Sequence, residues 1–108
     1  MANQDYIKNN TAKLENFLKA IKKAYDFIMT SDINDVVNSL RPSFSTSTDE
    51  SIKASILSYK KIDAWCATPV MTEDSYTRLL DMLQGAGELT TRVEFSKVVD
   101  NTVANKIK

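Results

Sequence analysis

The sequence has little of what enzyme and metal sites are usually built from. It contains no histidine and a single cysteine, Cys66. One cysteine cannot form a disulfide within the chain, and without histidine or a C-x-x-C pair there is no zinc-site pattern. A glycine-rich phosphate loop is also lacking, because Gly85 and Gly87 close a predicted helix instead of opening one. We therefore predict no metal, no cofactor and no catalytic residue.

The sequence also lacks an excess of either charge. It has 14 lysines and arginines and 14 aspartates and glutamates, so its formal net charge is zero. Surfaces for nucleic acids or anionic membranes usually need a positive excess. The basic cluster Lys19, Lys22 and Lys23 is therefore interpreted as a solvated helix face rather than a phosphate site. We predict no nucleic-acid partner, and a small helical nucleic-acid binder is the weakest of the alternatives.

Long apolar runs and turn residues are scarce as well. No apolar run approaches the roughly 20 residues of a membrane span. The N-terminal residues MANQDYIKNN have no apolar stretch of the kind that marks a signal peptide, so this chain carries no predicted targeting signal. Two glycines and two prolines are few for a sheet with tight hairpins. This composition favours an all-α fold.

Residues 68–87, TPVMTEDSYTRLLDMLQGAG, contain the signals of a complete helix. Thr72 is the expected N-cap, because its hydroxyl can accept a backbone N–H of the first turn. Met71 before the cap and Tyr76 after it have the spacing of a hydrophobic staple. Gly87 suits the left-handed residue that follows a helix. Apolar residues repeat between these ends at helical spacing: Tyr76, Leu79, Leu80 and Leu83.

Further helices are predicted from the same kinds of signal. A short turn covers 5–9, and Thr11 is the expected N-cap of a helix of about 17 residues. Ser31 or Asp32 caps a shorter helix that Pro42 ends. The apolar stripes of these two helices are Leu14, Phe17, Leu18, Ile21, Tyr25 and Ile28 in the first, and Ile33, Val36, Val37 and Leu40 in the second.

Two more helices complete the prediction. Ser47, with Glu50 at capping-box spacing, or Thr48 caps the first of them. Ser96 is the expected cap of the last. Their apolar residues are Ile52, Ile56, Tyr59 and Ile62 in one, and Val98, Val99, Val103 and Ile107 in the other. The sequence thus predicts a single domain, 1–108, folded as a compact all-α bundle of four to five amphipathic helices.

No group of residues indicates catalysis. The carboxylate pairs Glu73/Asp74 and Asp49/Glu50 lie in first turns, where capping and the helix dipole explain them. We therefore predict that the chain is not an enzyme. Cys66 is expected to be a small, partly buried apolar residue. Trp65 is expected to fill a gap between helices; if the chain bound a ligand, Trp65 and Tyr59 would be the aromatic faces available to hold it.

Several blocks, taken in order, resemble a known family. They are YIKNNTAKLENFLKAIKKAYDFIM, SDINDVV, TDESIKASILSY, PVMTEDSYTRLLDMLQGAGEL and VEFSKVVDNTVANKI. They are similar to the C-terminal portion of ABC-transporter solute-binding proteins of the nitrate, sulfonate, taurine and thiamine-pyrimidine-precursor class. The residues that match the pattern are Tyr6, Asn10, Phe17, Leu18, Ala20, Lys23, Tyr25, Met71, Thr72, Leu79, Leu83, Gly87, Val99, Asp100 and Asn101.

This resemblance implies a fragment of a larger protein. Members of the family are about three times longer, with two α/β lobes that close on a ligand. The resemblance therefore implies that the N-terminal lobes are missing, and that through them the parent would reach an ABC permease. It places the parent outside the cytoplasmic membrane, as a periplasmic protein or a membrane-anchored lipoprotein. The family's ligand residues lie mainly in the missing part, so no residue of this chain is assigned to the solute.

Two further expectations follow. We expect the isolated chain to bind no transported solute, whether nitrate, a sulfonate or a pyrimidine precursor. If helices lost the surface that they cover, their apolar faces would be exposed, and a homodimer is the simplest way to cover them. The residues expected on such faces are Phe17, Ile21, Ile28, Val99 and Val103. The alternative function is a stand-alone helical module that binds a protein partner.

Overall fold

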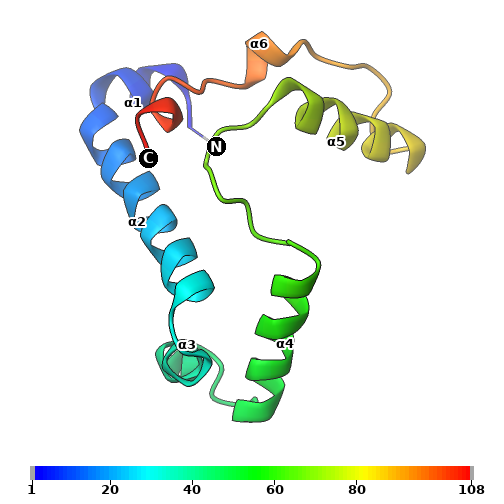
Figure 1. The fold of residues 1–108 in the computed structure, drawn as a ribbon. Helices are drawn as coiled ribbons and strands as arrows, with labels where there is room; N and C mark the ends of the chain where they lie inside the picture. Colours follow the sequence, from blue (N-terminus) through cyan, green and yellow to red (C-terminus); the bar gives the residue numbers. More distant parts are fainter. Residues whose placement is uncertain (1, 108) are drawn as a thin grey trace. The chain divides into compact units, whose positions relative to one another are not determined.

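The computed structural model describes residues 2–107 and is helical, with no strand among those residues (Figure 1). The all-α prediction is therefore confirmed. The elements are α1 (Gln4–Asn9), α2 (Thr11–Thr30), α3 (Ile33–Leu40), η1 (Arg41–Ser43), α4 (Asp49–Lys61), α5 (Glu73–Gly85), α6 (Phe95–Val98) and η2 (Ala104–Lys106). The chain falls into two units, which are described separately: unit 1 comprises 1–15 and 69–108, and unit 2 comprises 16–68, so that the first boundary lies within α2.

Unit 2 has a small core between α3 and α4. Val36 and Val37 from α3 meet Ile52 and Ile56 from α4, and all four side chains are buried. Their spacing explains the contact, because residues three to four apart lie on one face of a helix. Half-buried apolar residues pack around this core: Ile28, Ile33, Leu40 and Trp65.

A side chain caps the N-terminus of each of the two helices that form this core. Asp32 accepts the Asn34 amide at 2.8 Å and caps α3. Thr48 accepts the Ser51 amide at 3.2 Å and caps α4. Each cap satisfies a backbone donor that the helix leaves unpaired. Of the alternatives that the sequence left open, Asp32 and Thr48 are therefore the caps. Ser47 lies in the preceding turn, where its amide donates to the Phe44 carbonyl at 3.0 Å.

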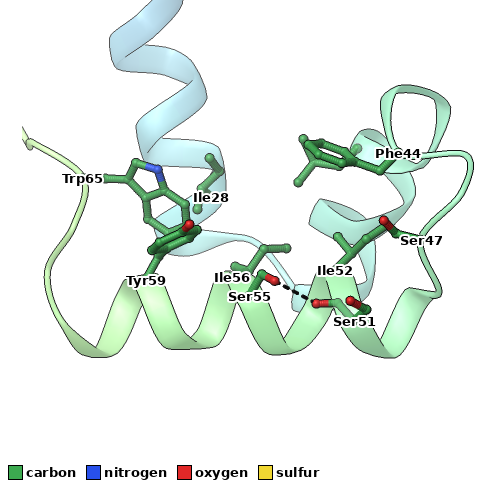
Figure 2. A pocket seen from close by; sticks show the side chains of 10 residues that line it. Ile28, Phe44, Ser47, Ser51, Ile52, Ser55, Ile56, Tyr59 and Trp65 are labelled. Carbon is green, nitrogen blue, oxygen red and sulfur yellow. Dashed lines mark hydrogen bonds between the residues drawn. The ribbon is translucent and has the colours of Figure 1, made fainter.

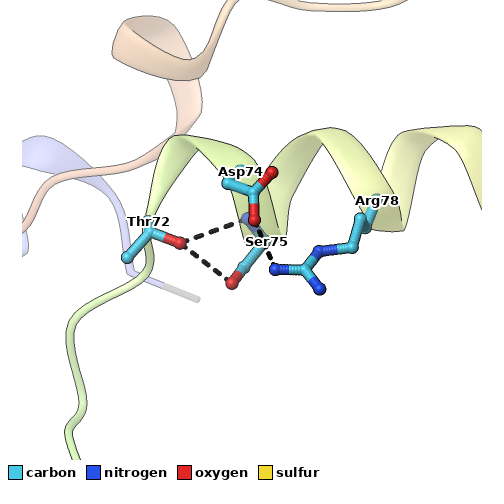
Figure 3. A network of polar contacts seen from close by, with 4 residues as sticks. All are labelled: Thr72, Asp74, Ser75 and Arg78. Carbon is cyan, nitrogen blue, oxygen red and sulfur yellow. Dashed lines mark hydrogen bonds and ion pairs between the residues drawn. The ribbon is translucent and has the colours of Figure 1, made fainter.

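In unit 1, α5 has the two ends that its sequence predicts. The Thr72 hydroxyl accepts the Ser75 amide at 3.1 Å and also lies 2.9 Å from the Ser75 hydroxyl (Figure 3). At the other end Gly87 has a φ of 77°. Its amide donates to the Gln84 carbonyl, and the Glu88 amide donates to the Leu83 carbonyl. This is the paired bonding of a Schellman motif, which needs a left-handed residue and so favours glycine.

Two predicted helix starts in unit 1 are wrong. Thr11 is not an N-cap, because the chain runs from α1 into α2 and the Thr11 hydroxyl donates to the Ile7 carbonyl at 2.8 Å. Ser96 is not the cap of a long last helix. It lies inside the four-residue α6, which Glu94 precedes without a side-chain capping bond.

Side chains after α6 explain why the last helix stops. The Asp100 carboxylate accepts the Thr102 amide at 2.9 Å. The Asn101 side chain bonds the backbone of Met71 twice, accepting from its amide at 3.2 Å and donating to its carbonyl at 2.8 Å. Asp and Asn side chains that bind the backbone in this way compete with helix formation. Hydrogen bonds from Thr102, the hydroxyl first and then the amide, hold the pKa of the Asp100 carboxyl below its usual range.

Candidate functional site

A groove of about 470 Å³ lies along α4 within unit 2 (Figure 2). Its floor is apolar and continuous with the core of the unit. Ile52 and Ile56 line it from α4, Ile28 from α2 and Leu40 from α3. Because buried side chains in a core are closely packed, the floor of the groove is expected to be rigid.

Aromatic side chains stand at the two ends of the groove (Figure 2). Phe44 is at one end, in the loop after η1, and is half exposed. Tyr59 and Trp65 are at the other end, with ring centroids 5.4 Å apart and planes inclined by 66°. This edge-to-face contact is a favoured aromatic arrangement. It fixes the pair while leaving Tyr59 half exposed to solvent.

A row of serine hydroxyls lines the groove, from the turn before α4 into α4 itself. Ser47, Ser51 and Ser55 all line the groove and recur every four residues. The Ser55 hydroxyl donates to the Ser51 carbonyl at 3.0 Å. Within residues 2–107, the hydroxyls of Ser47, Ser51 and Tyr59 make no hydrogen bond. The groove therefore offers polar groups that a bound molecule could engage.

No charged side chain lines this groove among the described residues. The nearest ion pair in sequence joins Arg41 and Asp49 at 3.1 Å, and Arg41 also donates to the Ser47 carbonyl. Because these charges satisfy one another, neither is presented to the groove as an unpaired partner. The arrangement suits an uncharged molecule, since a buried charge needs a partner.

The structure brings together the two aromatic residues that the sequence singled out. Tyr59 and Trp65 share one end of the groove, and Trp65 also packs on the core as predicted. The sequence missed Phe44 and the serine row. Phe44 lies in the polar stretch SFSTSTDE, where a lone aromatic residue carries no periodic signal. The four-residue spacing of the serines was visible, but small polar residues at that spacing are ordinary on a helix surface.

The other sequence candidates lie elsewhere. Lys22 pairs with Asp26 at 2.5 Å and stands 5.7 Å from the centre of the Tyr25 ring, which favours the solvated-face interpretation. Asp74 is paired with Arg78 four residues along the same helix (Figure 3). Cys66 is exposed, so the prediction of partial burial is wrong; it lies in an irregular connection after α4, beyond the helical stripes.

Unit 1 has a shallower hollow of about 210 Å³ beside α5. Tyr76 lines it, donates its hydroxyl to the Val93 carbonyl at 2.9 Å and meets Phe95 edge to face. Arg92 also lines it but is held by Asp81 at 2.6 Å and by Gln84. These contacts occupy the polar groups of Tyr76 and Arg92, and the hollow has less than half the volume of the groove, so it is a weaker site.

Within 2–107 no group of three or more histidine, cysteine, aspartate or glutamate side chains is placed to hold a metal ion. No helix in the same range is both long and apolar enough to cross a membrane.

The chain is similar to one protein that has been named as a binding protein. It is 27% identical over 107 residues to "Putative binding protein YtlA" from Bacillus subtilis (strain 168). The alignment covers 99% of this chain but 32% of that protein, so the chain spans about a third of the length of the curated relative that it matches. No family model matches the sequence, and no solved structure is significantly similar to it.

Proposed function

We propose that this chain is the C-terminal helical segment of a substrate-binding protein that captures a small solute for an ABC importer. One observation carries the proposal: the whole chain aligns with a third of a protein named as a binding protein. The sequence blocks that resemble solute-binding proteins support the ABC class. In this proposal the segment has a structural role and is not an enzyme, and the parent acts outside the cytoplasmic membrane.

The small amount of buried apolar surface in the two units supports a role inside a larger body. Few apolar side chains are buried, whereas many large ones are exposed by more than a third. Helices in a complete domain normally bury such a stripe against a neighbouring element. The exposed residues are Tyr6, Phe17, Ile21, Phe27, Phe44, Leu57, Tyr59, Ile62, Leu79, Met82, Val93 and Val98. Under the proposal, the partners that cover part of this surface are the N-terminal lobes of the parent.

Reading the DNA upstream of Met1 tests the proposal directly. An in-frame region that encodes an α/β protein with a secretion or lipoprotein signal is the expected result. A ribosome-binding site directly before Met1, preceded by an unrelated gene, would overturn it. The full reading frame should then be produced and titrated with nitrate, a sulfonate and a pyrimidine precursor, because the solute is expected to bind only between complete lobes.

The isolated chain should bind none of the anionic solutes. Nitrate and a sulfonate need cationic or hydrogen-bonding groups that surround them, and no charged side chain among the described residues lines the groove in unit 2. Isothermal calorimetry of the chain with each anion should show only heats of dilution. Saturable heat at micromolar concentration would contradict this expectation.

A stand-alone helical interaction module is the second candidate. The observation that favours it is the exposed pair Phe17 and Ile21, which lie four residues apart on α2 and are 61% and 52% exposed. An amphipathic helix with such a face can dock in an apolar groove of a partner. The upstream DNA separates the two candidates, since the module requires its own start signal.

A further inference from the structure

We propose that the groove along α4 is a binding site for an uncharged, largely aromatic small molecule with one or two hydrogen-bonding groups. This site belongs to unit 2 alone and does not depend on the proposed importer function. All of its lining residues lie within 28–65, inside the single stretch that forms unit 2.

The size of the groove indicates a small molecule. Its volume of about 470 Å³ falls within the range of roughly 300–1,000 Å³ that is typical of small-molecule sites. Ser51 and Tyr59 are eight residues apart on α4, which is about 12 Å along a helix axis. Phe44 stands at one end and the Tyr59–Trp65 pair at the other (Figure 2). A helix of another protein would need open ends, whereas this groove suits a compound two to three rings long.

The lining indicates the chemistry of the ligand. Isoleucines form the floor and aromatic rings form the ends, and such surfaces favour flat apolar groups. The groove supplies no charge of either sign from the described residues, so a charged ligand would lose its hydration without gaining a partner. The hydroxyls of Ser51 and Tyr59 have no protein partner within 2–107 and can bond a ligand oxygen or nitrogen.

The neutral fluorophore N-phenyl-1-naphthylamine is the probe for this site. Trp65 is the only tryptophan, so its fluorescence reports on one end of the groove. Titration of the chain with the probe should quench Trp65 and enhance probe emission with the same saturable curve, at one probe per chain. The anionic relative 1-anilinonaphthalene-8-sulfonate should bind at least about tenfold more weakly, because the groove has no cation to receive it.

Matched variants separate the groove from general apolar surface. Phe44→Ser should lower the affinity for the probe at least about tenfold, whereas Phe17→Ser should leave this affinity unchanged. Both residues are exposed phenylalanines of unit 2, at 50% and 61%, and only Phe44 lines the groove. Ser55→Phe places a ring over the middle of the groove and should also block the probe. Ser55 is exposed on α4, so circular dichroism should remain that of the wild type.

Three results would overturn the proposal. The first is a lack of saturable binding up to the solubility limit of the probe. The second is an equal loss of affinity in Phe17→Ser and Phe44→Ser, which would mean diffuse binding to exposed apolar surface. The third is a stoichiometry of one probe per two chains with loss of binding on dilution, which would place the probe between copies. None of these results bears on the upstream reading frame, so the importer proposal is tested separately.

Discussion

Adjacent residues on α4 have opposite environments and should respond differently to truncation. Ile56 is 4% exposed in the core of unit 2, and Leu57 is 49% exposed. Ile56→Ala should lower the free energy of unfolding by about 2–3 kcal/mol, because it removes buried methyl groups and leaves a cavity beside the groove. Leu57→Ala should change it by less than about 0.5 kcal/mol. Urea unfolding followed by Trp65 fluorescence measures both, and equal losses would contradict the assigned core.

The Asn101 side chain should stabilise unit 1 through its two bonds to the Met71 backbone. Asn101→Ala leaves a part-buried amide and carbonyl of Met71 without these partners. We expect a loss of about 1–3 kcal/mol in unfolding free energy and faster hydrogen exchange at the Met71 amide. Asn105→Ala is the control, because the Asn105 side chain is exposed and makes no hydrogen bond within the described residues. Unchanged exchange at Met71 in Asn101→Ala would refute the role.

Asp100 should contribute a small acid sensitivity to unit 1. Its pKa is lower in the folded chain than in the unfolded chain, so the folded state binds the proton more weakly. The contribution is therefore present above the unfolded pKa of about 4 and is lost as the pH falls through the folded pKa. Thr102→Val removes the hydroxyl donor and should raise the Asp100 pKa toward its ordinary value. Carboxyl NMR titration of both proteins measures this, and an unchanged pKa would contradict it.

The sequence identified part of the candidate site at the residue scale. Tyr59 and Trp65 were recognisable because exposed aromatic faces are the usual ligand platforms in a chain without catalytic groups. Phe44 was not, because its place at the groove depends on how the loop between η1 and α4 folds back. The exposure of Cys66 was missed for a similar reason. An irregular connection has no periodicity from which burial can be read.

At the scale of elements, the cap of α5 gives a direct test. Thr72→Ala removes the hydroxyl that accepts the Ser75 amide and should cost about 1 kcal/mol of unfolding free energy. Thr72→Ser keeps the acceptor and should cost at most a few tenths of that. Thermal unfolding followed by circular dichroism compares the two. A serine variant as unstable as the alanine variant would show that the methyl group matters instead of the cap.

The long helices were predictable because several independent local signals agree in each. In α5, the cap at Thr72, the apolar stripe and Gly87 all point to the same boundaries. The prediction of the last helix was wrong. Its apolar spacing is compatible with a helix, but the side chains of Asp100 and Asn101 bond to the backbone and prevent the helix from continuing. The partner of Asn101 is Met71, thirty residues earlier, and local periodicity cannot reveal a contact at that separation.

At the scale of the whole molecule, the exposed face of α2 should promote self-association of the isolated chain. Phe17 and Ile21 are exposed as expected, whereas Ile28 and Val99 are half-buried and Val103, at 7% exposure, is buried. We therefore expect a homodimer at micromolar concentration through Phe17 and Ile21, weakened by Phe17→Ser and unaffected by Phe44→Ser. Light scattering checks this, and a mass of about 12.1 kDa at every concentration would contradict it.

The division of the chain into units has a consequence for synthesis on the ribosome. Unit 2 is one continuous stretch, whereas unit 1 joins residues 1–15 to residues 69–108. Residues 16–68 can therefore complete their contacts while residues 69–108 are still being translated, since domains form as their residues emerge. Residues 1–15 must instead wait for residues 69–108. A nascent chain stalled shortly after α4 has left the exit tunnel should already protect the amides of Val36 and Ile56 from solvent exchange.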